Sequence, residues 1–358
     1  MTNVYKQLAE RLDQLPQGYP ATETGVELKI LEKIFSPEDA KTALKLKYFP
    51  ETADAIANRL GKPTEKIRET LDEMAHKGQI GSVTSNGHQV YMLAPFVVGI
   101  YEYQVHRLDK ELVNLFEEYL PTLAKSFGGY EPALARTIPI NKNLKQDYQI
   151  QPYENLTEML EEAKSFRVLD CICRKEQSIM GKPCEHTLEV CLSFSKEEGA
   201  YDYFSRGGRI ISKQEAFKII DQTENEGLIH NVFYNVKEGY GAVCNCCSCC
   251  CGVIRSMKQY GGTHSLASSN YIAVIDTDEC TSCGICADER CQMDAISENE
   301  DSYQVVNNLC IGCGVCTITC PVEAITLAQK PETEQHNTPE DFVDWSMKRA
   351  ANRGIKLE

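Results

Sequence analysis

The residues of this chain best suited to chemistry are its cysteines. There are 18 among 358 residues, and the densest stretch, CNCCSCCC from Cys244 to Cys251, has cysteine at six of its eight positions. A lone buried cysteine behaves as a small hydrophobic side chain, but six in one stretch need another explanation. Clustered thiolates are the ligands of zinc and of iron–sulfur clusters. The sequence therefore predicts cysteines that bind metal or take part in redox chemistry.

The rest of the composition indicates where such cysteines would work. The N-terminal stretch MTNVYKQLAERLDQLPQGYP carries charges throughout and lacks the apolar core of a signal peptide. No run of about 18 apolar residues occurs, so we expect no membrane span. We therefore expect a cytoplasmic protein. In a reducing cytosol, clustered cysteines bind metal or do redox chemistry more often than they form disulfides.

The C-terminal cysteines form an internal repeat. CTSCGICADERCQMDAI begins at Cys280 and CIGCGVCTITCPVEAI begins at Cys310, with spacings C-x2-C-x2-C-x4-C and C-x2-C-x2-C-x3-C-P. With this doubled motif, residues 271–329 resemble the bacterial two-[4Fe-4S] ferredoxins. In that family three cysteines of one repeat and the last cysteine of the other repeat hold each cubane.

The resemblance implies a ligand set for each of two [4Fe-4S] clusters. The first cluster would use Cys280, Cys283, Cys286 and Cys320. The second would use Cys310, Cys313, Cys316 and Cys291. The first repeat departs from the family pattern by one extra residue before Cys291 and by Gln292 where proline is usual. We interpret this as a small bulge with all ligands kept, and zinc is the alternative occupant.

Ten further cysteines form a second system upstream. They are Cys171, Cys173, Cys184, Cys191, Cys244, Cys246, Cys247, Cys249, Cys250 and Cys251. A zinc site or a cubane consumes four thiolates, so ten suggest one or two further metal centres. We favour additional iron–sulfur clusters because the chain also holds a ferredoxin repeat, with zinc or reactive dithiols as alternatives.

The dense stretch leaves its own conformation open. In an extended chain, Cys244, Cys246 and Cys250 would face one way, and Cys247, Cys249 and Cys251 the other. Each triplet would then be completed by the Cys171 and Cys173 pair or by Cys184 and Cys191. A helical or irregular conformation is the alternative. The CCCG sequence at residues 249–252 also resembles the cysteine-rich motif of heterodisulfide reductases, although the downstream CxxC of that family is missing.

The first hundred residues predict helices followed by a hairpin. Two apolar stripes with helical spacing precede the dipeptide Asn86-Gly87, a strong hairpin signal. Residues 24–95 thereby resemble the winged-helix family. The helix expected over residues 64–77 has a net charge of about −1, and the whole chain has −15. These charges argue against nucleic-acid binding, and we expect this part to dock on protein.

We predict an α+β chain with three domains and a tail. These are a winged-helix-like domain at 1–99, a mixed α/β cysteine-rich metal-binding domain with a leading helix at 100–260, a two-[4Fe-4S] ferredoxin fold at 271–329 and a helical tail at 330–358. RTIPI and FRVLD predict strands, and Ser212 with Glu215 predicts a capped helix start. The small polar stretch 261–270 reads as a linker, and Trp345 as a docking contact.

Together these features predict electron transfer. Residues 271–329 hold ten acidic residues and one basic residue, Arg290, a net charge of −9 that favours a partner with a basic surface. We expect a redox partner protein, such as a subunit of an oxidoreductase complex. The alternatives are a redox-sensing transcriptional regulator and a reductase whose cysteine-rich centre is catalytic.

Overall fold

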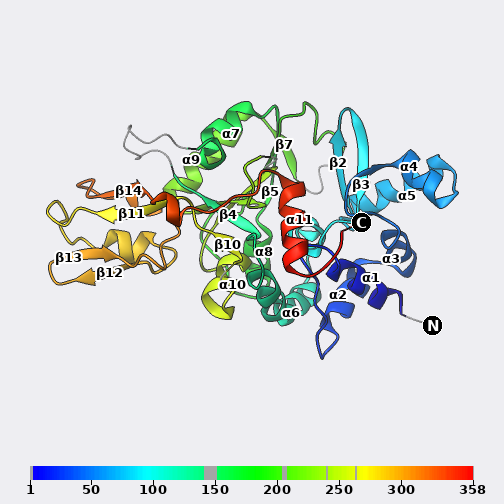
Figure 1. The fold of residues 1–358 in the computed structure, drawn as a ribbon, viewed down its shortest axis with the longest axis horizontal. Coiled ribbons are helices and arrows are strands. Elements are labelled where there is room, and N and C mark those ends of the chain that lie inside the picture. The colour runs from blue at the N-terminus through cyan, green and yellow to red at the C-terminus, as the bar shows by residue number, and fades with distance from the viewer. Residues whose placement is uncertain (1–2, 141–150, 204–207, 239–240, 263, 358) are drawn as a thin grey trace.

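A seven-stranded mixed sheet forms the middle of the molecule (Figure 1). The structure is a computed structural model that describes residues 3–140, 151–203, 208–238, 241–262 and 264–357. The strand order is β10-β4-β8-β9-β6-β5-β7, and every neighbouring pair is antiparallel except β10 with β4. The strands are β4 (Ala135–Ile138), β5 (Ser165–Asp170), β6 (Glu189–Ser195), β7 (Arg209–Ile211), β8 (Ile229–Phe233), β9 (Ala242–Cys246) and β10 (Leu266–Ala267).

This sheet brings distant cysteines together. β6 lies between β5 and β9, so Leu169 faces Cys191 across one strand pair and Leu192 faces Val243 across the next. Asn231 of β8 faces Cys244. Three cysteine-bearing segments far apart in the sequence therefore meet at neighbouring positions of one sheet.

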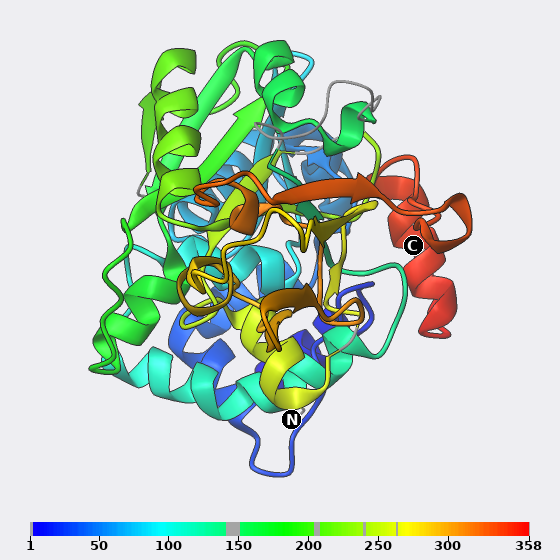
Figure 2. The same cartoon turned by 90° about the vertical axis from the view of Figure 1, so that its left-hand side faces the viewer.

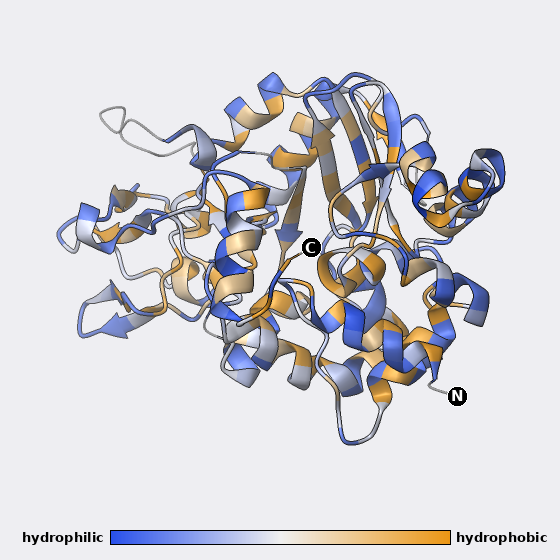
Figure 3. Ribbon diagram, turned by 45° about the vertical axis from the view of Figure 1, so that its right-hand side comes forward, coloured by the Kyte–Doolittle hydropathy of each residue, from blue (hydrophilic) through white to orange (hydrophobic). Residues whose placement is uncertain are grey.

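Helices α7 (Leu156–Glu162) and α9 (Lys213–Asn225) share a core with this sheet. Ser212 caps α9 by accepting a hydrogen bond from the Glu215 backbone N–H at 3.2 Å, which confirms the predicted helix start. The predicted strands RTIPI and FRVLD are also confirmed, as β4 and β5. In the ribbon coloured by hydropathy, hydrophobic and hydrophilic residues alternate around the helices (Figure 3), as expected for helices with one buried face.

The N-terminal part consists of helices and a small sheet of order β1-β3-β2. The predicted hairpin is confirmed: Asn86 and Gly87 join β2 and β3 with φ of 50° and 73°, the left-handed values that a two-residue turn of this kind requires. Its elements are α1 (Val4–Asp13), α2 (Val26–Ile34), α3 (Pro37–Ala43), β1 (Glu51–Thr52), α4 (Ala53–Leu60), α5 (Thr64–His76), β2 (Gly81–Ser85) and β3 (His88–Met92).

The leading helix α6 (Lys110–Gly128) joins the N-terminal part to the sheet. Its buried residues Phe116 and Leu120 belong to a core that also contains Leu31 of α2 and Leu169 of β5. One hydrophobic core therefore extends across residue 99. The remaining elements before residue 271 are η1 (Phe96–Ile100), η2 (Glu102–Gln104), η3 (Pro152–Glu154), α8 (Ile172–Ile179) and α10 (Gly252–Tyr260).

The C-terminal repeat forms a small lobe in front of the sheet in Figure 2. Its strand β11 (Tyr271–Ile275) pairs antiparallel with β14 (Ile325–Gln329), so the two ends of the repeat lie side by side. β12 (Ile296–Asn299) and β13 (Ser302–Val305) form a hairpin between them. The short turns are η4 (Cys286–Arg290), η5 (Val315–Thr317) and η6 (Glu332–Glu334).

The segment predicted as a linker is wrong for its described residues, 261, 262 and 264–270. Leu266 and Ala267 form β10 and pair with β4. Ser269 is buried, and its hydroxyl donates to the Gly312 carbonyl at 2.7 Å. Here a small polar side chain hydrogen-bonds a buried backbone group, so the segment packs into the fold instead of forming a flexible linker.

The C-terminal helix α11 (Phe342–Asn352) packs onto the body of the molecule. Trp345 is fully buried and its indole Nε1 donates to the Ala133 carbonyl at 2.8 Å. Arg349 is equally buried and donates to the carbonyls of Pro16 and Phe127 at 3.0 and 2.9 Å. The prediction that Trp345 is a docking contact is therefore wrong. Across the described residues, every helix is too short or too polar to cross a bilayer.

Candidate metal centres

The ten central cysteines divide into two groups, which we call the six-thiol group and the four-thiol group. Along the six-thiol group, consecutive side chains interact in the order Cys171, Cys173, Cys251, Cys246, Cys244 and Cys191. All six are buried or half-buried. The cysteines come from the residue after β5, from the first turn of α8, from β6 and β9, and from the residue before α10.

The four-thiol group is tighter. Its members are Cys184, Cys247, Cys249 and Cys250, and all four sulfurs lie within 4.8 Å of one another. The Sγ of Cys184 lies 3.8 Å from that of Cys247 and 3.6 Å from that of Cys249. Cys249 and Cys250 are 3.7 Å apart at their sulfurs.

The predicted triplets from strict alternation are wrong in two members. Alternation holds only through Cys246, where β9 ends, because residues 248–250 form a turn and α10 begins at Gly252. As a result Cys250 joins Cys247 and Cys249, while Cys251 joins Cys244 and Cys246. A two-residue period applies to a strand and cannot be continued through a turn.

In each group the neighbouring side chains favour the thiolate at one cysteine and disfavour it at another: interaction with Cys247 raises the pKa of Cys250, and interactions with Cys191 and Cys246 raise the pKa of Cys244. Interactions with Cys250 and with the Arg174 guanidinium lower the pKa of Cys247 to about 4. Interactions with Cys244 and Cys251 lower the pKa of Cys246 to about 5. Arg174 is itself buried, held by the Asn245 carbonyl, to which it donates at 2.8 Å. Thiolates at such close range need a cation between them, which a metal supplies.

The structure also brings the cysteines of the repeat together in two sets. Cys280, Cys283, Cys286 and Cys320 line one small cavity together with Tyr303. Cys291, Cys310, Cys313 and Cys316 form the second set, in which each thiol interacts electrostatically with others of the set. Gly312 is needed beside this second set, because a Cβ there would lie 2.1 Å from the Tyr271 carbonyl oxygen, and its φ is 66°.

The extra residue in the first repeat is absorbed by a wide turn. The Cys291 N–H donates to the Cys286 carbonyl at 3.0 Å, five residues back, so residues 286–290 form one π-type turn. This local insertion corresponds to the bulge that we predicted from the spacing.

Gln292, which follows that turn, joins the two cysteine systems. Its Oε1 accepts a hydrogen bond from the Ser248 N–H at 3.0 Å, and its Nε2 donates to the Gly227 carbonyl at 3.1 Å. Arg290 donates to the carbonyls of Glu224 and Asn225 at 3.0 and 2.9 Å. Sequence reasoning marked Gln292 as a departure from the family pattern but missed this contact, since Ser248 lies 44 residues away along the chain.

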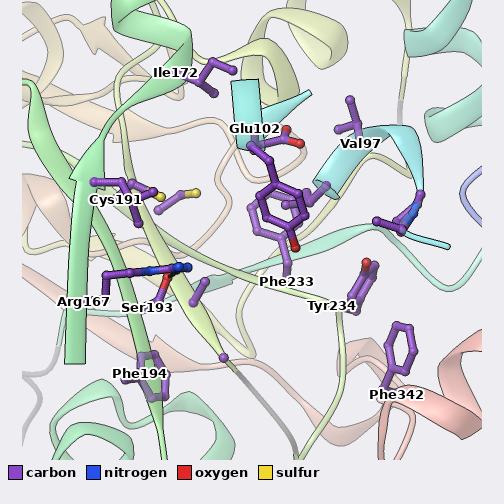
Figure 4. Close-up of a pocket in the computed structure, with 18 of the residues that line it drawn as sticks. Val97, Glu102, Arg167, Ile172, Cys191, Ser193, Phe194, Phe233, Tyr234 and Phe342 are labelled. Atoms are coloured by element: carbon purple, nitrogen blue, oxygen red, sulfur yellow. Dashed lines mark hydrogen bonds between the residues drawn. The ribbon is translucent and has the colours of Figure 1, made fainter. Parts of the chain in front are cut away.

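A large cavity of about 1310 Å³ adjoins the six-thiol group. In Figure 4, Cys191 and Arg167 lie on one side, Phe233 and Tyr234 on the other, and Glu102 above them. Arg167 is 8% exposed, lies 4.7 Å from the ring centroid of Tyr201, and donates to the Ser193 hydroxyl at 3.2 Å. Burial raises the pKa of Glu102 to about 7.

This cavity was not predicted from the sequence. Its wall comes from strands of the seven-stranded sheet, from strands of the small β1-β3-β2 sheet and from the segments between them, including η1 and η2. No single stretch of sequence carries a pattern for it, so only the folded chain reveals it.

Comparison with known proteins supports the iron–sulfur reading of the repeat. Residues 303–326 match the 4Fe-4S binding domain family. The chain is 28% identical over 100 residues to hydrogenase-4 component A of Escherichia coli (strain K12), covering 26% of this chain and 46% of that protein. It is 49% identical over 37 residues to a 7Fe ferredoxin of Hydrogenibacillus schlegelii, covering 10% of this chain and 47% of that protein.

A ferredoxin of Alicyclobacillus acidocaldarius subsp. acidocaldarius is equally similar, at 49% identity over 37 residues. The chain spans about half the length of the curated relatives it matches. No solved structure matches it. The C-terminal part is therefore an iron–sulfur domain of ferredoxin type, within an α+β chain, and its clustered thiols suit [4Fe-4S] binding.

Proposed function

We propose that this chain is an electron-transfer protein in which two ferredoxin-type [4Fe-4S] clusters exchange electrons with a metal centre at the central cysteines. The first cluster would be held by Cys280, Cys283, Cys286 and Cys320, and the second by Cys291, Cys310, Cys313 and Cys316. When bound, each cluster supplies one-electron transfer at a potential set by its exposure and hydrogen bonds. The chain's own residues supply the ligands, the burial and the connection between the sites.

The observation that carries this proposal is the contact made by Gln292. This residue directly follows Cys291 of the second set, and it accepts a hydrogen bond from Ser248, which stands between Cys247 and Cys249. A short path of covalent bonds with one hydrogen bond therefore leads from Cys291 through Gln292 to Ser248 and the central cysteines on either side of it. An isolated ferredoxin domain tethered to an unrelated domain would not require such a contact.

The partner we propose is a subunit of an oxidoreductase complex. One relative bears the name of a hydrogenase component, which supports this class of partner. The order of helices and strands over residues 24–95 supports the winged-helix interpretation, and we propose that this part docks on protein. The acidic helix α5 argues against DNA, because phosphate contacts need clustered Lys and Arg.

The proposal is tested on the full chain, purified without oxygen. Iron, sulfide and zinc are counted, and each reduction step is followed by electron paramagnetic resonance. We expect about eight irons assignable to the ferredoxin lobe and electron equilibration with a further centre. Zinc at the eight ferredoxin cysteines, or a central region that never exchanges electrons with the lobe, would overturn it.

A second candidate, a reductase, is favoured by the cavity beside the six-thiol group. Buried Arg167 and the Ser193 hydroxyl suit an anionic group, and Phe233, Tyr234 and Phe342 suit a flat apolar body. This combination fits a small unsaturated or aromatic carboxylate. The test is titration of the reduced full chain with cinnamate, read by calorimetry and by the spectrum of the central centre. Saturable binding that Arg167→Met weakens at least about tenfold supports the reductase, whereas no binding argues for the relay alone.

A further inference from the structure

The four-thiol group is more compact than a multi-iron cluster allows. Three of its sulfur–sulfur distances are 3.6, 3.7 and 3.8 Å, and no pair exceeds 4.8 Å. A tetrahedral ion with metal–sulfur bonds of about 2.3 Å holds its sulfurs about 3.8 Å apart, because the edge of a tetrahedron is about 1.6 times its centre-to-corner distance. The three short distances match this edge, and the other three pairs stay within 4.8 Å.

A cubane requires a wider arrangement of thiolates. Each of its four cysteines binds a different iron atom, so the four sulfurs surround a core of several atoms rather than one ion. The four-thiol group would have to expand at every edge to admit such a core. The side chains as they lie leave room for one atom at their centre.

We propose that Cys184, Cys247, Cys249 and Cys250 hold a single divalent metal ion in a tetrahedral site, and that the six-thiol group is a separate centre. Four thiolates and no open position are typical of structural zinc, and mononuclear iron is the other ion that four sulfurs suit. This inference goes beyond the electron relay proposed above and does not depend on it. It leaves the six-thiol group as the central centre that would exchange electrons with the lobe, and Cys246 and Cys251 of that group flank the turn that Gln292 contacts.

The surroundings are those of a closed structural site. Cys247 and Cys250 are buried with Leu228, while Cys249 reaches the surface. Four thiolates and one divalent ion together carry a net negative charge. The Arg174 guanidinium lies beside Cys247 and offsets part of that charge. The backbone between the ligands is held by the hydrogen bond from Ser248 to Gln292.

Such a site would act as a clip between three parts of the chain. Cys184 lies in the connection between α8 and β6, and the other three ligands lie in the turn before α10. Gln292 brings the ferredoxin lobe to the same turn. Because such a site exists only in the folded chain, metal binding stabilises the folded state. The ion would therefore hold in place the turn before α10 that the ferredoxin lobe contacts.

The test compares metal counts of full-length variants purified without oxygen. Cys184→Ser should lose one metal ion per chain, with no loss of sulfide and no change in the resonance of the ferredoxin clusters. A fall of one in zinc identifies zinc, and a fall of one in iron identifies mononuclear iron; both support the proposal. Loss of several irons together with sulfide, or no loss at all, would overturn it.

A measurement on the unaltered chain guards against misfolded variants. X-ray absorption at the edge of the ion lost in Cys184→Ser should give four sulfur neighbours at about 2.3 Å with no second metal shell. A nearby metal shell would contradict a single ion. Because the ferredoxin irons are counted separately, failure of this inference is distinguishable from failure of the electron relay.

Discussion

The two cysteine systems of this chain are built in opposite ways. In the ferredoxin lobe, two copies of one local motif supply eight thiols, and the resemblance to the bacterial ferredoxins implied which four would hold each cluster. In the central system, ten thiols come from separate segments between Cys171 and Cys251, and the order of strands β9, β6 and β5 determines their grouping. A repeated motif of a known family allows a ligand set to be proposed from the sequence, even though each set takes one cysteine from the other copy of the motif. The grouping of cysteines assembled across a sheet depends instead on topology.

The largest effect we predict separates the two systems by iron content. Cys246→Ser should remove metal from the six-thiol group, because Cys246 lies between Cys244 and Cys251 in that row of thiols. The ferredoxin irons should remain. In the mirror experiment, Cys313→Ser should remove about four of the eight ferredoxin irons and spare the central metal.

Metal and sulfide analysis of both variants, beside the unaltered chain, checks this prediction. If Cys246→Ser kept its full metal content and reduction spectrum, the central cysteines would be spare thiols or redox switches. If either variant lost metal from both systems, the two would form one cooperative unit rather than independent centres.

The same contrast explains how much of the molecule could be predicted from the sequence. The hairpin at Asn86 and Gly87, the capped start of α9 and the strands β4 and β5 depend on local signals, and each is confirmed. Three other features depend on contacts between distant residues. They are the assignment of Cys250 and Cys251 to different thiol groups, the buried segment around Ser269 and the burial of Trp345. Those three predictions were wrong because composition and period carry no information on which segments meet.

A smaller effect is predicted at the contact between the systems. Gln292→Ala removes hydrogen bonds to Ser248 and Gly227, so the free energy of unfolding should fall by about 1–3 kcal/mol. Electron exchange between the lobe and the central cysteines should also slow. Gln304→Ala, on the exposed face of the hairpin in the same lobe, is the matched control and should change neither quantity.

Denaturant unfolding and stopped-flow reduction measure the two effects of Gln292→Ala. Equal exchange rates in this variant and in the control would mean that electrons take another route. The contact would then serve stability alone, and the observation on which the relay proposal depends would lose its force.

The smallest predicted effect concerns the outer surface of the lobe and its response to salt. All ten acidic side chains between residues 271 and 329 are exposed, while the one basic residue, Arg290, is buried and donates to backbone carbonyls. The exposed charge of this lobe is therefore entirely negative. Association with a basic partner should slow by about tenfold or more between low and high ionic strength, because salt shortens the screening length from about 30 Å at 0.01 M to about 3 Å at 1 M.

Electron exchange within the chain should not share this salt dependence, since Gln292 and the cysteines it connects are at least half-buried apart from Cys249. The double variant Glu298→Gln with Glu300→Gln, two exposed carboxylates of the lobe, should weaken the salt dependence of association and leave the internal rate unchanged. Stopped-flow rates over a series of salt concentrations separate the two steps. An association rate indifferent to salt would mean that the partner docks elsewhere, and an internal rate that fell with salt would mean that the lobe leaves the central cysteines during turnover.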